Sequence, residues 1–282
     1  MNVADDTRSE TFETTDPVTL SLRIPGGQVF VRASATSETR VELEALNDAA
    51  REVMPRVRLE GRPRGDRFEV VVDVPQQRGF IKFSSPKFEL RIDCPSEADI
   101  DLRTASADLE ARGGMRDVEV NSASGEVDVD MIGGSLRVKS ASGDVRVESV
   151  EGESSVTTAS GDIHIGSAGG PVTATTASGD LRVREAEHGI DARTVSGDLQ
   201  LESVFQGAVS ANAVSGDVQI GIRRGSKVWI DASSVSGDTN SELELAGEAP
   251  AGEGPLVEVR ARTVSGDVRL VRAQSSTPLT RD

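Results

Sequence analysis

Apolar residues alternate with polar ones in short segments that recur along most of the chain. One apolar set stands two residues after a recurring glycine, and others stand four residues after it and seven before it. The first set is Val127, Val145, Ile163, Leu181, Leu199, Val218 and Val268. The second is Val129, Val147, Ile165, Val183, Leu201, Ile220 and Leu270, and the third is Val118, Leu136, Val172, Ile190, Val209, Ile230 and Val259. A period of two is typical of half-buried strands. Each repeat is therefore expected to hold two short strands.

The glycine belongs to a recurring Ser-Gly-Asp turn that sets the length of the repeat. It occurs at Gly125, Gly143, Gly161, Gly179, Gly197, Gly216, Gly237 and Gly266, so successive steps are 18, 18, 18, 18, 19, 21 and 29 residues. Ala107 stands one step earlier and marks a degenerate first repeat, which makes nine. Glycine and aspartate are both favoured in tight turns, the first through its backbone freedom and the second through side-chain hydrogen bonds.

These observations predict an all-β fold, a right-handed parallel β-solenoid with about 18 residues per coil. Stacked coils, about 4.8 Å apart, would bury the apolar faces and pair the strands in parallel. The array is expected over residues 96–272, with a Gly/Pro/Glu loop inserted at 241–255 and a disordered tail at 273–282. A β-sandwich of hairpins is the alternative fold, whereas a propeller would need about forty residues per blade.

Residues 1–95 are expected to form a β-rich cap that includes early coils, because open solenoid ends need covering. Apolar residues and a glycine share the spacing of the repeat at Leu20, Leu22, Gly27, Val29 and Val31. The composition from Glu42 to Met54 predicts a short helix that stops at Pro55. Alternation predicts strands at Arg67–Val74 and Phe88–Ile92.

Alanine and valine exchange places between two positions of the repeat. Five residues before the glycine, Val120, Val138 and Val156 give way to Ala174, Ala192, Ala211, Ala232 and Ala261. Two residues before it, Ala123, Ala141, Ala159 and Ala177 give way to Val195, Val214, Val235 and Val264. Close packing penalises both voids and excess volume. The exchange predicts that the two positions share one core layer.

Charge and composition narrow the classes of partner. The 282 residues carry 31 basic and 47 acidic side chains, a net charge of −16, which disfavours nucleic acid and anionic lipid surfaces. Seven Phe, one Trp and no Tyr argue against a stacking groove for sugars or bases. The single cysteine, Cys94, cannot form an intramolecular disulfide.

With no apolar leader and no stretch of about 18 apolar residues, we expect a cytoplasmic protein without membrane insertion, or alternatively an envelope-associated one.

A column of acidic residues that follows the turn glycine is the sharpest candidate for a binding site. Its members are Asp108, Glu126, Asp144, Asp162, Asp180, Asp198, Asp217, Asp238 and Asp267. Stacked carboxylates repel unless they are compensated, either by Ca²⁺ or by hydrogen bonds within the turns. The calcium hypothesis uses Asp144, Asp162, Asp180, Asp198 and Asp217. With one carboxylate per coil, the structural role is the favoured one, and no metal is predicted.

A second column consists of serines, Ser124, Ser142, Ser160, Ser178, Ser196, Ser215, Ser236 and Ser265. A nucleophilic serine needs a base within reach, and the only histidines are His164 and His188. His164 lies between Ile163 and Ile165 and should point outward. Repeated carboxylates indicate structure rather than a local active site. We therefore predict no catalytic residues and no cofactor.

The repeated Thr/Ser-Ala/Val-Ser-Gly-Asp-Val/Leu-x-Val units, together with Phe88–Pro95, resemble the bacterial putative-adhesin proteins with β-strand repeats, also called the toastrack domain. The resemblance covers about residues 15–272. It implies a β-helical body and association with cell-envelope or stress-response membrane proteins, and it supplies no catalytic residues.

We expect a non-enzymatic scaffold or protein-interaction module whose flank, or loop 241–255, contacts a protein partner. Membrane-associated proteins are candidates for that partner. A Ca²⁺-stabilised adhesin-like surface protein is the first alternative, and a β-helical carbohydrate-active enzyme is the second. The partner and the oligomeric state are not specified by these patterns.

Overall fold

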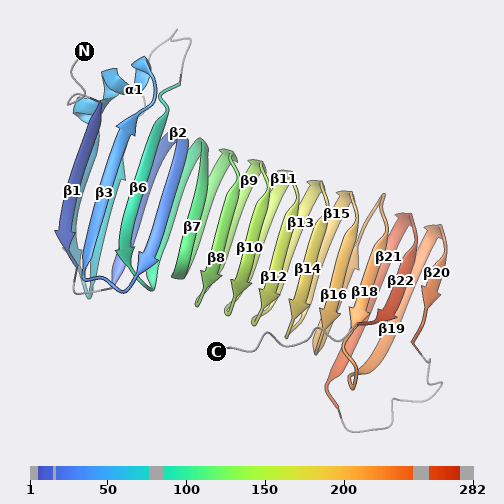
Figure 1. Ribbon diagram of the computed structural model, residues 1–282. Helices are drawn as coiled ribbons and strands as arrows, with labels where there is room; N and C mark the ends of the chain where they lie inside the picture. The colour runs from blue at the N-terminus through green and yellow to red at the C-terminus, as the bar shows by residue number, and fades with distance from the viewer. Residues whose placement is uncertain (1–5, 15–16, 76–84, 244–253, 274–282) are drawn as a thin grey trace. The chain divides into compact units, whose positions relative to one another are not determined.

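The computed structural model describes residues 6–14, 17–75, 85–243 and 254–273. The chain divides into two compact units, residues 1–152 with 157–160 and residues 153–156 with 161–282. Each unit is built from β-strands stacked in parallel coils (Figure 1), which confirms the predicted β-solenoid. Most of the predicted loop and the predicted tail, residues 244–253 and 274–282, lie outside the described residues.

Unit 1 contains ten strands, one short helix and a 3-10 turn. They are β1 (Thr7–Glu13), β2 (Val18–Ser34), β3 (Glu38–Ala45), α1 (Asp48–Val53), η2 (Met54–Arg56), β4 (Arg58–Arg64), β5 (Arg67–Asp73), β6 (Phe88–Pro95), β7 (Ala98–Ser124), β8 (Val127–Ile132), β9 (Leu136–Ser142) and β10 (Val145–Val150).

Strand β11 (Ser154–Ser160) has residues in both units, and the strands after it belong to unit 2. They are β12 (Ile163–Ala168), β13 (Val172–Ser178), β14 (Leu181–Ala186), β15 (Ile190–Ser196), β16 (Leu199–Val204), β17 (Gly207–Asn212), β18 (Val218–Ile222), β19 (Lys227–Ser236), β20 (Thr239–Ser241), β21 (Leu256–Ser265) and β22 (Val268–Arg272).

Equivalent residues of successive coils are paired in register, and their side chains form the core. In unit 1, Val127 pairs with Val145. In unit 2, Ile163 pairs with Leu181, and Leu181 pairs with Leu199. All five side chains are at most 2% exposed. Burying a branched apolar side chain contributes about 1.5–3 kcal/mol, so the stack of apolar rows holds each unit together.

The N-terminal region begins with the predicted early coil. Strand β2 pairs in parallel with β7 over its whole length, so that Leu20 faces Ile100 and Val29 faces Leu109. Strand β6 pairs in parallel with the second half of β2. Two antiparallel strands then follow outward from β6, first β3 and next to it β1 (Figure 1). Strand β5 pairs in parallel with the first half of β2, and β4 pairs antiparallel with β5. The predicted strands at Arg67–Val74 and Phe88–Ile92 correspond to β5 and β6.

The helix predicted from Glu42 to Met54 is wrong over its first half. Val41, Leu43 and Ala45 are buried in strand β3 and alternate with exposed glutamates. This period of two outweighs the helical propensity of the individual residues. Helix α1 begins only after Asn47, whose side chain accepts a hydrogen bond from the N–H of Ala50 at 2.9 Å and caps the helix.

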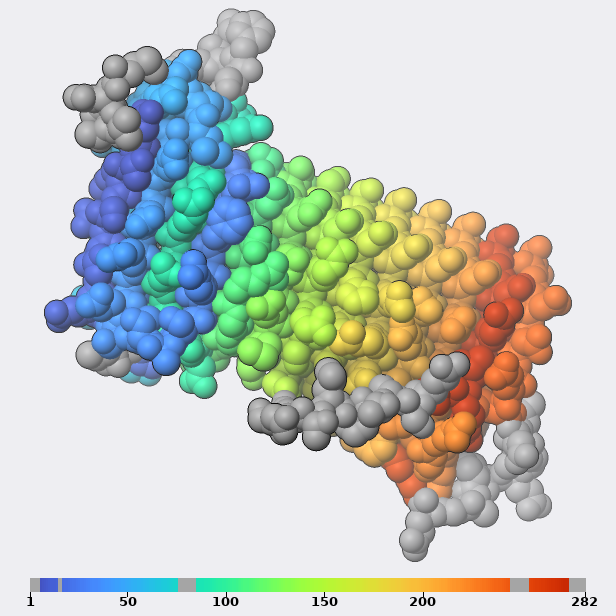
Figure 2. All heavy atoms as spheres, in the orientation of Figure 1, coloured from blue at the N-terminus to red at the C-terminus, as the bar shows by residue number. Residues whose placement is uncertain are grey.

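The last two coils of unit 2 are stacked out of chain order. Strands β21 and β22 pair with β17 and β18 on one side and with β19 and β20 on the other. In Figure 2 the red stripe of residues 256–272 accordingly lies between two orange stripes. The coil that ends the stack is therefore 227–241, although it comes earlier in the sequence. Stacking order and chain order therefore differ at this end of unit 2.

The terminal coil differs from the others in its polar core positions. Thr239 and Ser241 stand two and four residues after Gly237, where the other coils carry Val, Ile or Leu. Thr239 is exposed, and Ser241 is half-buried. Among the described strands, only β21 and β22 pair with this coil, and a coil that is covered on one side gains little from apolar residues at these places. This substitution was a visible sequence signal for the end of the stack.

Candidate functional site

Five of the aspartates that follow a turn glycine accept a hydrogen bond from the backbone of the neighbouring coil. Oδ1 of Asp162 accepts a hydrogen bond from the backbone N–H of Asp180 at 2.8 Å. The same contact joins Asp180 to Asp198, Asp198 to Asp217, Asp217 to Asp267 and Asp267 to Asp238, at 2.8–2.9 Å. In unit 1, Asp108 accepts from the N–H of Glu126 at 2.9 Å. The column is a ladder of charge-assisted hydrogen bonds that links coils.

The ladder gives these carboxylates a structural role, but its hydrogen bonds join neighbouring coils, whereas bonds within each turn were expected. Within the described ranges of the chain, no three His, Cys, Asp or Glu side chains converge in a way that could hold a metal ion. Binding of Ca²⁺ by Asp144, Asp162, Asp180, Asp198 and Asp217 stays a hypothesis, which melting temperatures measured with and without calcium test.

The serine column lies on the exposed side of the turns. His188 is exposed, and its Nδ1 lies 2.6 Å from the carbonyl oxygen of Gly169. His164 is half-buried between the fully buried Ile163 and Ile165, as the alternation predicted. The contact of His188 is thus with a backbone carbonyl oxygen and not with the serine column.

A row of exposed valines runs along the turns of unit 2. Val195, Val214, Val264 and Val235 are 54%, 49%, 49% and 81% exposed. The prediction that this position shares a core layer with Ala192 and its equivalents is wrong. The two positions are three residues apart, and an odd separation along a strand places side chains on opposite faces.

The inward position is instead the residue immediately before, which is Thr194 before Val195, Thr263 before Val264 and Ala213 before Val214. Thr176, Thr194 and Thr263 are at most 4% exposed. The hydroxyl of Thr263 donates to the carbonyl oxygen of Gly216 at 3.0 Å, which satisfies it inside the stack. Each turn of the valine row therefore presents a valine and an aspartate to solvent, and two of these four turns bury a threonine.

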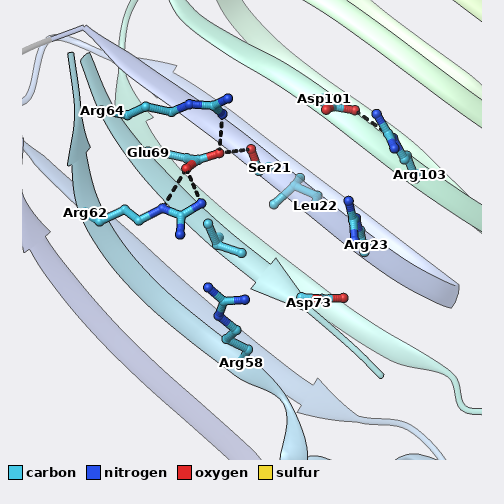
Figure 3. A pocket seen from close by; sticks show the side chains of 11 residues that line it. Ser21, Leu22, Arg23, Arg58, Arg62, Arg64, Glu69, Asp73, Asp101 and Arg103 are labelled. Atoms are coloured by element: carbon cyan, nitrogen blue, oxygen red, sulfur yellow. Dashed lines mark hydrogen bonds and ion pairs between the residues drawn. The ribbon is translucent and has the colours of Figure 1, made fainter. Parts of the chain in front are cut away.

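An arginine pocket lies on the outer face of unit 1, over strands β4, β5, β2 and β7 (Figure 3). It is a cavity of about 330 Å³. Its lining side chains are Ser21, Leu22, Arg23, Arg58, Arg62, Arg64, Glu69, Val71, Asp73, Asp101 and Arg103. Apart from Leu22, these residues lie at every second position of the paired strands, so alternation brings their side chains to one face.

Glu69 is the buried anchor of this pocket. Its Oε2 accepts from Arg62 and its Oε1 accepts from Arg64 at 2.9 Å and from the hydroxyl of Ser21 at 2.8 Å. Burial of the side chain opposes its ionisation, but the hydrogen bonds from Arg62 and Ser21 outweigh burial and lower the pKa of Glu69. Glu69 therefore stays charged and holds two guanidinium groups at the edge of the cavity.

The turn ladder and the strand stack extend over a region that matches one family model. The model for Toastrack DUF4097 matches residues 20–271. The chain belongs to this family. The resemblance drawn from the Ser-Gly-Asp units is thereby confirmed, and the toastrack region includes the early coil at β2 as well as the out-of-order coil at β21 and β22.

Several solved structures are similar to this toastrack chain at low sequence identity. A "putative adhesin" from Bacteroides fragilis is 11% identical, with a TM-score of 0.46, and the match covers 94% of this chain and 96% of that one. A "putative lipid binding protein" from Parabacteroides distasonis is 10% identical, with a TM-score of 0.45 and coverage of 95% and 97%. A "putative adhesin" from Parabacteroides merdae is 12% identical, with a TM-score of 0.38 and coverage of 95% and 97%. No protein with a curated description matches the chain.

Sequence reasoning missed the arginine pocket of the toastrack fold. Arg58, Arg62 and Arg64 occupy alternate positions of one strand, and that spacing was the available signal. What the pattern could not supply was the pairing of β4 with β5 and of β5 with β2. Among the described residues, no helix is long and apolar enough to cross a membrane.

Proposed function

We propose that this chain is a non-enzymatic interaction scaffold, and that unit 2 binds a basic, partly apolar segment of a partner protein. The observation that carries the proposal is the exposed valine row, which runs beside the aspartate ladder on the same turns. Val214 and Asp217 are both exposed and are separated only by Ser215 and Gly216. An apolar row flanked by carboxylates complements a segment that presents apolar and cationic side chains together.

The valine row is continuous in space because the turns are stacked. The backbone bonds from Gly197 to Ser215, from Gly216 to Ser265 and from Gly266 to Ser236 place the valines in the order Val195, Val214, Val264 and Val235. With coils about 4.8 Å apart, four valines span roughly 14 Å. Exposed apolar side chains that gather in one place commonly mark a contact surface.

Charge favours a basic partner and suggests where it would be found. The net charge of −16 attracts cationic segments and repels nucleic acid and anionic lipid. Cytoplasmic segments next to membrane spans are rich in Lys and Arg and adjoin apolar residues. We therefore place the scaffold in the cytoplasm, bound to such a segment of a membrane protein.

A labelled peptide tests the proposal. An amphipathic Lys/Leu peptide should bind the intact chain in a fluorescence anisotropy titration, and the matching Glu/Leu peptide should not. Replacing Val214→Ser and Val264→Ser together should weaken binding by about tenfold, which corresponds to about 1.4 kcal/mol for two exposed apolar contacts. Added salt should weaken it further, since exposed charges are screened.

Met131→Ser is the matched control, because Met131 is 53% exposed and lies in unit 1. This variant should bind the Lys/Leu peptide within twofold of the original chain. Equal affinity for the two peptides, or an unchanged affinity in the double valine variant, would remove the basis of the proposal.

A further inference from the structure

We infer that the arginine pocket of unit 1 binds a small dianionic oxyanion of the phosphate monoester class. The pocket lies in a different unit from the valine row, and the inference does not depend on the proposed function. It rests on strand register, on unequal ion pairing and on the size of the cavity.

Strand register places three arginines and one aspartate in a single row across four strands. Arg58 faces Asp73, Asp73 faces Arg23, and Arg23 faces Arg103. Figure 3 shows these four side chains in that order across the ribbon. Like charges on directly opposite residues of neighbouring strands are destabilising. The Arg23–Arg103 pair therefore opposes folding, although Asp73 beside Arg23 and Asp101 beside Arg103 offset part of this repulsion. An anion between the two guanidinium groups would relieve the remainder.

Most carboxylates around this row form ion pairs with arginines other than Arg23. Glu69 is held by Arg62 and Arg64, and Glu60 pairs with Arg58 at 2.6 Å. Arg103 reaches Asp101 only at 3.5 Å between Nε and Oδ1. Among the described side chains, Arg23 has no hydrogen-bond or ion-pair partner. The guanidinium group of Arg23 is thus available to bind a ligand.

The charge balance fits a dianion. Five arginines against the three carboxylates Glu69, Asp73 and Asp101 give the lining a charge of 5 − 3 = +2. Including Glu60 at the rim leaves +1, in a chain whose total is −16. A local excess of positive charge on so acidic a chain would be unusual if the pocket had only a structural role. The acidic remainder would repel an extended polyanion, which favours a small ligand.

The geometry of the groups fits phosphate. Guanidinium forks bind phosphate oxygens in a bidentate manner, which lysine cannot do. A phosphate monoester carries close to two negative charges at neutral pH. Val71 lines the same cavity and offers apolar contact to the remainder of a small ligand. A cavity of about 330 Å³ is at the lower end of the size of small-molecule sites.

Calorimetric titration of the full chain with inorganic phosphate tests the inference. Phosphate should bind with saturable heat at one site per chain, sulfate should compete, and chloride at equal ionic strength should not. Arg23→Gln should weaken phosphate binding at least tenfold, and Arg103→Gln should do the same. Arg137→Gln is the matched control, because Arg137 is an exposed arginine of β9 outside the pocket, and it should bind within twofold of the original chain.

A second readout separates loss of a ligand from loss of the fold. In the absence of phosphate, Arg23→Gln should melt at the same temperature as the original chain or higher, because the like-charge contact with Arg103 is relieved. If the original chain shows no saturable heat with phosphate, or if Arg23→Gln and Arg137→Gln bind it equally, the inference is wrong.

The source of the phosphate group is decided by two further titrations. Glycerol 3-phosphate represents a soluble monoester, and phosphatidylcholine vesicles containing phosphatidic acid represent a lipid headgroup. Binding in either arm supports the inference only when Arg23→Gln abolishes it. Binding that survives Arg23→Gln in both arms contradicts it.

Discussion

At the scale of single residues, each aspartate of the ladder has two structural effects. Asp198 accepts the N–H of Asp217 through Oδ1, so a backbone donor at the turn is satisfied and two coils are joined. The carboxylates nonetheless stand in a column, where like charges repel. Hydrogen bonding to the amide is therefore expected to outweigh the repulsion, and no cation is required by the geometry.

Replacing Asp180→Asn and Asp198→Asn together tests this account against the calcium hypothesis. The amide oxygen of Asn can still accept the same backbone bond, so the variant should fold and melt at or slightly above the temperature of the original chain. Both proteins should melt alike in millimolar Ca²⁺ and in excess chelator. Calcium that raises the melting temperature of the original chain by several degrees, but not that of the variant, would favour the Ca²⁺-stabilised alternative.

At the scale of the element, the glycine turn is constrained by both backbone conformation and contact. Gly179 has a φ of +142°, and a Cβ added to it would lie 2.2 Å from the carbonyl oxygen of Gly161. The stacked turns approach so closely that any side chain would push two coils apart. The recurrence of glycine at this place follows from the stacking distance as well as from the turn.

Gly179→Ala should therefore destabilise unit 2 by more than Gly225→Ala. Gly225 also has a positive φ, +90°, but a Cβ there meets no atom within 4 Å. We expect a loss of about 1 kcal/mol from conformation alone at Gly225, and at least about 2 kcal/mol more at Gly179 from the backbone clash. Chemical denaturation followed by the fluorescence of Trp229, the single tryptophan, measures both. Similar losses for the two variants would show that the close contact relaxes at little cost.

At the scale of the whole molecule, the order of the last two coils makes the end of unit 2 cooperative. The strand β19 pairs with β21, and β20 pairs with β22, but neither pairs with β17 or β18 in the described part of the chain. The coil 227–241 is therefore held by a coil that the chain supplies later. A sequential solenoid can be shortened from its end, whereas this one would lose an internal coil.

Truncating the chain after Leu243 should accordingly release residues 227–241. Their amides should exchange with solvent at rates close to those of an unfolded chain, as measured by hydrogen exchange and mass spectrometry. The amides of β14, which pairs with β12 and β16, serve as the internal control and should stay protected. Persistent protection over 227–241 would mean that the terminal coil docks directly on β17 and β18.

The sequence by itself determined the parts of this protein that depend on local period. Alternation with a period of two, combined with a turn glycine every 18 residues, gives the strands, the buried rows and the toastrack resemblance, because the same residue must return to the same face in each coil. The same alternation explains why the prediction of a shared core layer was wrong. The alanine and valine positions are an odd number of residues apart, so their side chains lie on opposite faces of the strand.

Tertiary structure alone decided which coil follows which and which outer faces meet. Gly237 precedes Gly266 in the chain but follows it in the stack, because pairing depends on which strand edge is free and not on chain order. The row of Arg58, Asp73, Arg23 and Arg103 likewise depends on the pairing of β2 with β5 and with β7, both of which are far from β2 in the sequence. Local patterns specify what each strand exposes, whereas long-range pairing specifies what lies beside it.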